Sequence, residues 1–287
     1  MTSPVLPVNF NPGGNGRFIF TVQDKYYACG GVQGGVISDD CSLYRIGSNE
    51  LIPVPSATLP RALSFGAAVK IKKNIVWLLG GRAQGVPFTD TSLLFNPATE
   101  SWSEHGAPRL QEPFAFGCVV PLNDDHTKFL FVGGEPTSAF GYKKAMIYDW
   151  NKDSWRRSSD MTVARRSTTN MCFRHTLANG RNVVIVVGGR FGVTGYINQT
   201  EIFDIKLETW TLGPVFPHGI DGGIVVQMDQ GTFMLGGRVL IGGLGLLTSK
   251  VWEMDHISLE WAERPDLELQ KAVGRVDGFI YNQNNSN

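Results

Sequence analysis

The sequence has no excess of either charge, because its 26 Lys and Arg residues balance its 26 Asp and Glu residues. A neutral chain creates no overall field that would attract nucleic acid or an anionic membrane. It also has no apolar run near the roughly 18 residues of a membrane-spanning helix. Its first residues lack the basic and apolar regions of a secretory signal. We therefore expect a cytoplasmic protein that binds neither nucleic acid nor membrane.

Cysteine is scarce, with four residues and no CxxC pair. Four scattered cysteines are too few for a disulfide-dependent fold, so reduced and buried thiols are expected. For Cys118 in FGCVV and Cys172 in NMCFR, packing of small side chains explains the residue better than reactivity does. Cys29 and Cys41 lie on neighbouring expected strands. Whether they are bonded stays open, because a disulfide needs Cα atoms within about 7 Å.

Motifs for catalysis and metal binding are also missing. The five histidines show neither HxH nor HExxH spacing, and the chain contains no GxSxG. We therefore expect no catalytic residue, no cofactor and no bound metal.

Glycine, in contrast, is abundant, and its 34 residues include a repeated pair. Five apolar runs end in Gly-Gly, and the first glycines of successive pairs are 48 to 55 residues apart. The second glycines of the pairs are Gly31, Gly81, Gly134, Gly189 and Gly237. After four of the pairs, an apolar strand and a polar turn lead to Trp102, Trp155, Trp210 and Trp261. Another apolar strand precedes each pair.

Each repeat therefore predicts four antiparallel strands, a to d in chain order, with strand b ending in Gly-Gly. One such sheet cannot cover both of its faces, so the units must stack on one another. The four tryptophans are expected to pack between stacked sheets. The glycines are expected to allow close approach of neighbouring sheets rather than to bind phosphate, because no helix follows them.

The period near 50, the four strands, the Gly-Gly pair and the spaced Trp together resemble the Kelch repeat. The resemblance implies an all-β, Kelch-type β-propeller that forms a single domain over residues 1–287. Five complete four-stranded blades are expected. We expect a sixth, composite or incomplete blade from the two termini, residues 5–10 and 271–282. A five-bladed ring or a truncated chain is the alternative.

The resemblance also implies a protein-interaction module, because Kelch-like adaptor domains bind partners through the loops of one face. The b–c and d–a loops should emerge together on that face. Five arginines in them are predicted to contact a partner, namely Arg61, Arg82, Arg166, Arg190 and Arg238. Guanidinium groups bind carboxylates, so the expected partner is a protein or peptide with an acidic segment.

Two other interpretations stay open at this point. The arginines could pair with Asp90, Glu112 or Glu135 of the same chain and form ordinary solvated surface. The alternative function is a sugar-processing enzyme of the epimerase or oxidase-like Kelch propeller branch. The copper oxidases of that branch carry adjacent Tyr-His ligands, and none of the seven tyrosines here precedes His. We therefore expect a monomeric, non-enzymatic scaffold, and its sequence contains no BTB or BACK domain.

Overall fold

The protein consists almost entirely of β-strands. A computed structural model describes residues 16–269, except 46–49, 72–74, 136–139 and 193, together with residue 272. These residues contain no α-helix, and short 3₁₀ helices such as η1 (Pro55–Ala57) and η3 (Pro265–Leu267) lie in connections. Within the same residues, no helix has the length and apolar character needed to cross a membrane.

Five four-stranded antiparallel sheets, here called blades 1 to 5, make up the fold. Blade 1 contains β1 (Phe18–Val22), β2 (Lys25–Cys29), β5 (Cys41–Arg45) and β6 (Glu50–Pro53), and blade 2 contains β7 (Ala67–Lys70), β8 (Val76–Leu79), β9 (Ser92–Asn96) and β10 (Ser101–Ser103). Blade 3 contains β11 (Cys118–Pro121), β12 (Lys128–Val132), β13 (Ala145–Asp149) and β14 (Ser154–Arg157). Blade 4 contains β15 (Cys172–Thr176), β16 (Asn182–Val187), β19 (Thr200–Asp204) and β20 (Thr209–Leu212), and blade 5 contains β22 (Ile224–Met228), β23 (Gly231–Leu235), β26 (Val251–Met254) and β27 (Trp261–Glu263).

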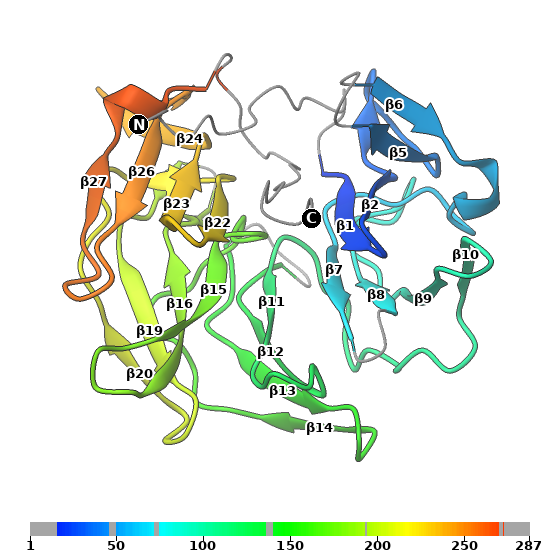
Figure 1. Cartoon of the computed structure of the whole chain (residues 1–287), viewed down its shortest axis with the longest axis horizontal. Helices are drawn as coiled ribbons and strands as arrows, with labels where there is room; N and C mark the ends of the chain where they lie inside the picture. The colour runs from blue at the N-terminus through cyan, green and yellow to red at the C-terminus, as the bar shows by residue number, and fades with distance from the viewer. Residues whose placement is uncertain are drawn as a thin grey trace.

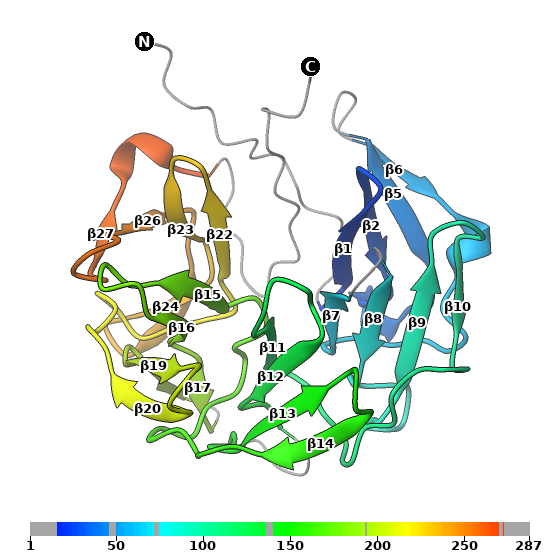
Figure 2. The same ribbon diagram turned by 60° about the horizontal axis from the view of Figure 1, so that its bottom comes forward.

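The blades lie in an arc around a central axis, with strand a innermost and strand d outermost (Figures 1 and 2). Blades 1 and 5 stand at the two ends of this arc. The five complete blades of a Kelch-type propeller are therefore confirmed. The expected sixth blade from residues 5–10 and 271–282 falls outside the described residues, apart from residue 272, and stays a prediction.

The hydrophobic core is divided into layers between blades. One layer joins Phe18 of blade 1 to Leu78 and Phe95 of blade 2. Blades 2, 3 and 4 have a neighbouring blade on each face. Their second strands are therefore almost entirely buried, as in β8 and β16. This explains why these strands read as continuous apolar runs rather than as alternating patterns.

The repeated tryptophans lie between neighbouring blades, as the sequence predicts. Three of their indole N–H groups donate to a carbonyl in the connection that ends the preceding blade: Trp102 to Ala57 (2.8 Å), Trp155 to Arg109 (3.0 Å) and Trp210 to Ser159 (2.9 Å). Trp261 packs against Phe173 and Phe216 of the preceding repeat. The tryptophans thus join blades through both packing and hydrogen bonds.

The Gly-Gly pairs lie where two blades approach most closely. Gly80 has a φ of +63°, and a Cβ there would collide with the carbonyl oxygen of Phe114 at the start of the next blade. Its neighbour Gly81 donates a backbone hydrogen bond of 2.7 Å to the same carbonyl. The contact requires the absence of a side chain, which supports a structural role for the glycines.

Backbone hydrogen bonds also connect neighbouring blades at the residues just before each innermost strand. Phe65 donates its N–H to the carbonyl of Gly16 (2.8 Å), and Phe116 donates to that of Phe65 (2.9 Å). Both phenylalanines have positive φ, +59° and +58°, and their rings stack with centroids 4.7 Å apart. The chain therefore adopts a strained conformation at this repeated position, where it turns into strand a and lines the central axis.

The four cysteines form two disulfides. Cys29 and Cys41 are directly opposite in β2 and β5, with Cα atoms 4.0 Å apart, which answers the question left open by the sequence. Cys118 and Cys172 are bonded across blades 3 and 4, with Cα atoms 6.2 Å apart. The expectation of reduced thiols is therefore wrong. The repeat places these two small side chains at matching positions on neighbouring inner strands, within bonding distance.

Candidate partner-binding face

The b–c and d–a loops meet on one face of the propeller, here called the loop face. Arg82 exchanges two backbone hydrogen bonds with Ser64, at 2.6 and 2.9 Å, and Arg190 exchanges two with Arg166, at 2.8 and 2.9 Å. In blade 5 the corresponding contact is a strand pair, between β21 (Ile220–Asp221) and β24 (Arg238–Ile241). The prediction that both sets of loops share a face is correct.

Two of the five predicted arginines are buried on this face and pair within the chain. Arg166, 8% exposed, contacts the carboxylate of Glu135 and donates to the carbonyl of Gly192 at 3.1 Å. This is the pairing with Glu135 that the sequence left as an alternative. Because a buried charge must be compensated, Arg166 is held by the loops themselves.

Arg190 is buried in the same way. It is 6% exposed, its Nη1 lies 3.5 Å from Oδ2 of Asp221, and its guanidinium covers the ring of Tyr196 at 4.8 Å from the centroid. Arg166 and Arg190 therefore connect blades 3, 4 and 5 beneath the surface. A role for these two in binding a partner stays a prediction that would require the loops to open.

The other three arginines reach the surface. Arg61 is exposed and pairs with Glu104 at 3.0 Å, and Arg82 is exposed with its guanidinium 6.0 Å from the Phe116 ring centroid. Arg238 is partly buried in β24. Within the described part of the chain, Arg82 and Arg238 form no ion pair. Of the five predicted arginines, three are therefore accessible to solvent and two are not.

Apolar side chains at the loop tips are the feature that sequence reasoning missed. Of the twelve large apolar side chains exposed among the described residues, eight lie in b–c loops, and every blade contributes. They are Val36, Val86, Phe140, Phe191, Ile241, Leu244, Leu246 and Leu247. The signal was present in the sequence as apolar residues within glycine-rich loops, such as RFGVTGY and RVLIGGLGLL.

Two of these side chains contact each other across blades. Phe140 is 61% exposed and Phe191 is 50% exposed, and their ring centroids are 5.8 Å apart. Phe191 lies in β17 (Arg190–Phe191), which pairs with β18 (Gly195–Tyr196). This strand pair thus presents an aromatic side chain to solvent directly beside the buried Arg190.

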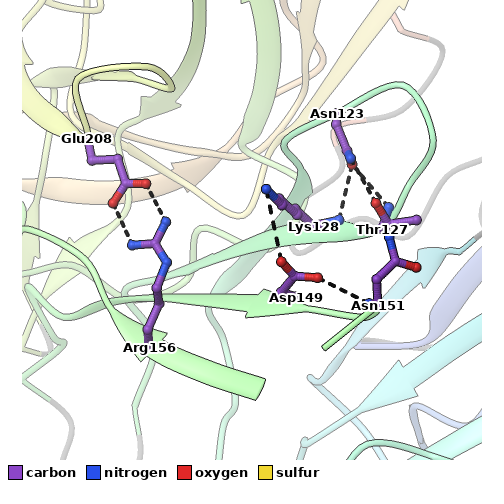
Figure 3. A network of polar contacts seen from close by, with 7 residues as sticks. All are labelled: Asn123, Thr127, Lys128, Asp149, Asn151, Arg156 and Glu208. Atoms are coloured by element: carbon purple, nitrogen blue, oxygen red, sulfur yellow. Dashed lines mark hydrogen bonds and ion pairs between the residues drawn. The ribbon is translucent and has the colours of Figure 1, made fainter. Parts of the chain in front are cut away.

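The opposite face, formed by the a–b and c–d loops, has a different chemistry. Figure 3 shows Arg156 of β14 directed at both carboxylate oxygens of Glu208, which lies in the c–d turn of blade 4. This contact lowers the pKa of Glu208. In the same view, Asp149 accepts a hydrogen bond of 3.1 Å from the Asn151 N–H and lies 4.0 Å from Nζ of Lys128. Charged groups in this region pair with one another.

A small cavity lies where the chain enters the innermost strands. This cavity, of about 30 Å³, is lined by residues that include Phe65, Phe116, Ser167 and Asn170. That volume holds roughly two or three water molecules. No group of three or more His, Cys, Asp or Glu side chains suited to a metal ion occurs within the described ranges.

Comparison with known proteins agrees with the repeat. The family model described as the Kelch motif matches residues 171–214. Kelch-like protein 40 of Xenopus tropicalis is 27% identical over 64% of this chain, and that of Mus musculus is 24% identical over 66%. The flagellar outer arm dynein alpha chain of Chlamydomonas reinhardtii is 25% identical over 72%.

These alignments cover small parts of the relatives, 27% and 28% of the two Kelch-like proteins and 4% of the dynein chain. A solved structure of YjhT superimposes with a TM-score of 0.69 and 13% identity, over 90% of this chain and 86% of that one. This likeness concerns the fold. The Kelch-motif match, the five four-stranded blades and these similarities together support a Kelch-type β-propeller fold.

Proposed function

We propose that the loop face binds another protein. The observation that carries this proposal is the display of large apolar side chains by the b–c loops of all five blades. Exposed apolar groups that gather on one face, with polar groups around them, are typical of protein interaction sites. The Kelch propeller fold supports a protein-interaction module in general, and its rigid blades hold the loops in place.

The charge of the loop face supports a partner with an acidic segment. Arg82 and Arg238 have no ionic partner within the described residues, so a carboxylate could bind them without breaking an existing ion pair. The exposed pair between Arg61 and Glu104 contributes only about 0–1 kcal/mol. Exchange of Glu104 for a partner carboxylate would therefore cost little.

A peptide experiment tests this proposal. A library of acidic peptides containing Leu or Phe is measured for binding at low and physiological salt. The Arg82→Ala/Arg238→Ala variant should lose binding by tenfold or more. The Phe191→Ser variant should weaken it at both salt concentrations, because an apolar contact is not screened by ions.

The control removes the same amount of positive charge from the opposite face. Lys152 and Lys206 are exposed in c–d turns, and Lys152→Ala/Lys206→Ala should leave binding unchanged. Lys72 and Lys73, in an a–b loop, lie outside the described residues and are less suitable. Equal loss in both double variants would show that binding follows net charge and that the loop face is not the site.

We also propose that the protein acts by binding rather than by catalysis. The alternative, a sugar-processing enzyme, would bind its substrate near the central axis, where the described cavity has a volume of about 30 Å³. A sugar needs a pocket several times larger. Turnover of a sugar substrate by the purified protein would favour the alternative.

A further inference from the structure

The b–c loop of blade 5 is a β-hairpin, and among the described residues no strand pairs with its outer edge. It consists of β24 and β25 (Leu244–Leu247), joined by Gly242 and Gly243. Both glycines have positive φ, +57° and +82°, which is the geometry of a two-residue type I′ turn. In the three-stranded sheet the order is β21, β24, β25, so β25 forms its outer edge.

The hydrogen-bond pattern of the hairpin identifies the backbone groups that are directed outward. Thr248 donates to Gly237 across the hairpin at 3.0 Å, whereas Leu240 donates away from it, to Gly219, at 2.8 Å. Hydrogen-bonded and non-bonded pairs alternate along an antiparallel ladder. Gly245, which is opposite Leu240, therefore directs its N–H and C=O outward, and so does Leu247.

The side chains of the hairpin differ between its two faces. Ile241, Leu244 and Leu246 lie on one face and are 48%, 65% and 47% exposed. On the other face the Tyr196 ring covers Gly245 so closely that a Cβ there would collide with the ring. One face of β25 is therefore an open apolar surface, and on the other face the Tyr196 ring occupies the place of a Gly245 side chain.

Edge strands in soluble proteins are usually protected by charge, by Pro or by an irregular bulge. Residues 239–249 contain no charged residue and no Pro. All four residues of β25 are exposed, and the strand follows a regular pairing register. Nothing in this segment would repel an identical segment placed beside it.

We propose that β25 pairs with β25 of a second copy of this chain. An antiparallel pair in which Gly245 of each copy is opposite Leu247 of the other uses all the outward groups and makes four hydrogen bonds. Leu246 then faces Leu246 across a two-fold axis, and Leu247 of one copy lies beside Gly245 and Tyr196 of the other. The two three-stranded sheets become one continuous six-stranded sheet.

The dimer is weak and reversible, because two short hairpins bury less surface than the roughly 1,200–2,000 Å² of a stable complex. A monomer is expected from the sequence. An unpaired strand edge cannot be recognised from composition, so this dimer could not be predicted there. The pairing uses backbone groups of β25, and Arg82 lies in another blade. Arg82→Ala should therefore dimerise like wild type while it weakens binding of acidic peptides, so failure of one proposal is distinguishable from failure of the other.

Sedimentation velocity over about a hundredfold range of protein concentration tests the pairing. Wild type should shift from monomer to dimer as concentration rises. Leu246→Glu alone and Leu246→Lys alone should each stay monomeric, because like charges meet at the two-fold axis. An equimolar mixture of the two variants should dimerise again. A monomeric wild type at every concentration, or a mixture that stays monomeric, overturns the proposal.

A second pair of variants separates backbone pairing from side-chain contact. Leu247→Pro removes an N–H that the hairpin itself does not use, and should abolish the dimer with the melting temperature nearly unchanged. Leu247→Ala keeps that N–H and should still dimerise. Equal dimerisation of wild type and Leu247→Pro would contradict strand pairing. If wild type stays monomeric but binds an extended apolar peptide, the edge pairs with a strand of another protein, and the dimer proposal is wrong.

Discussion

Arg165 and Glu201 form an ion pair in which neither side chain has any exposed surface. Nη2 of Arg165 lies 2.6 Å from Oε2 of Glu201, and Nη1 donates to the carbonyls of Gly188 and Gln199. Burial lowers the pKa of the guanidinium, and the carboxylate opposes that effect. The pair connects the segment that enters blade 4 to its third strand, beneath the loop face.

Removing one partner of this pair should lower the free energy of unfolding substantially. In Glu201→Gln, the charge of Arg165 stays buried without compensation, and we expect a loss of about 3–5 kcal/mol in the free energy of unfolding. Urea denaturation followed by circular dichroism measures it. Glu104→Gln, which breaks the exposed pair with Arg61, is the control and should change stability by about 0–1 kcal/mol. Similar small losses of stability in both variants would contradict a stabilising role of the buried Arg165–Glu201 pair.

Trp155 should contribute strongly to the contact between blades 2 and 3. Its ring lies beside Trp77 of blade 2 and Phe131 of blade 3, and its N–H donates to the Arg109 carbonyl. Trp155→Ala should cost about 3–5 kcal/mol, through lost contacts and a cavity. Leu207→Ala, at a side chain 62% exposed, should cost about 0.5 kcal/mol or less. Thermal unfolding of the two variants at one protein concentration gives the comparison.

The inter-blade disulfide should be detectable by mass. Without reductant, iodoacetamide should modify none of the four cysteines, because all are paired. With reductant and denaturant, four should react. Cys118→Ala/Cys172→Ala should lose about 2–4 kcal/mol of stability, since the bond joins two strands distant in the chain. Alkylation of Cys118 in the native, unreduced protein would show that this pair is not bonded.

Stability should fall at mildly acidic pH because of His175. Burial lowers the pKa of this imidazole, a hydrogen bond to the His256 backbone carbonyl partly opposes that effect, and the His256 side chain adds a smaller lowering. As pH falls below the usual His pKa of about 6.5, the unfolded chain takes up a proton that the folded protein does not, so unfolding becomes easier. His175→Gln should reduce the loss of stability between pH 7 and pH 5. The exposed His105→Gln should show the wild-type dependence.

The sequence by itself determined the repeat and therefore the blades. Each Gly-Gly pair lies where only a residue without a side chain fits between two blades. Each Trp lies where a large aromatic ring with an N–H group fills the contact between blades. Gly80 against the Phe114 carbonyl and Trp155 against the Arg109 carbonyl are examples. Such residues recur at a fixed spacing because each blade repeats the same local geometry, so they can be recognised without knowledge of any contact.

Only the tertiary structure decided which loop residues are available to a partner. Arg82 and Arg190 both follow a Gly-Gly pair, yet Arg190 is buried against Asp221 and Arg82 is exposed. Likewise, Cys118 and Cys172 are 54 residues apart and become neighbours only when blades 3 and 4 stack. Exposure, ion pairing and disulfide formation depend on distances between blades, and no local pattern encodes those distances because they arise from packing of the whole arc.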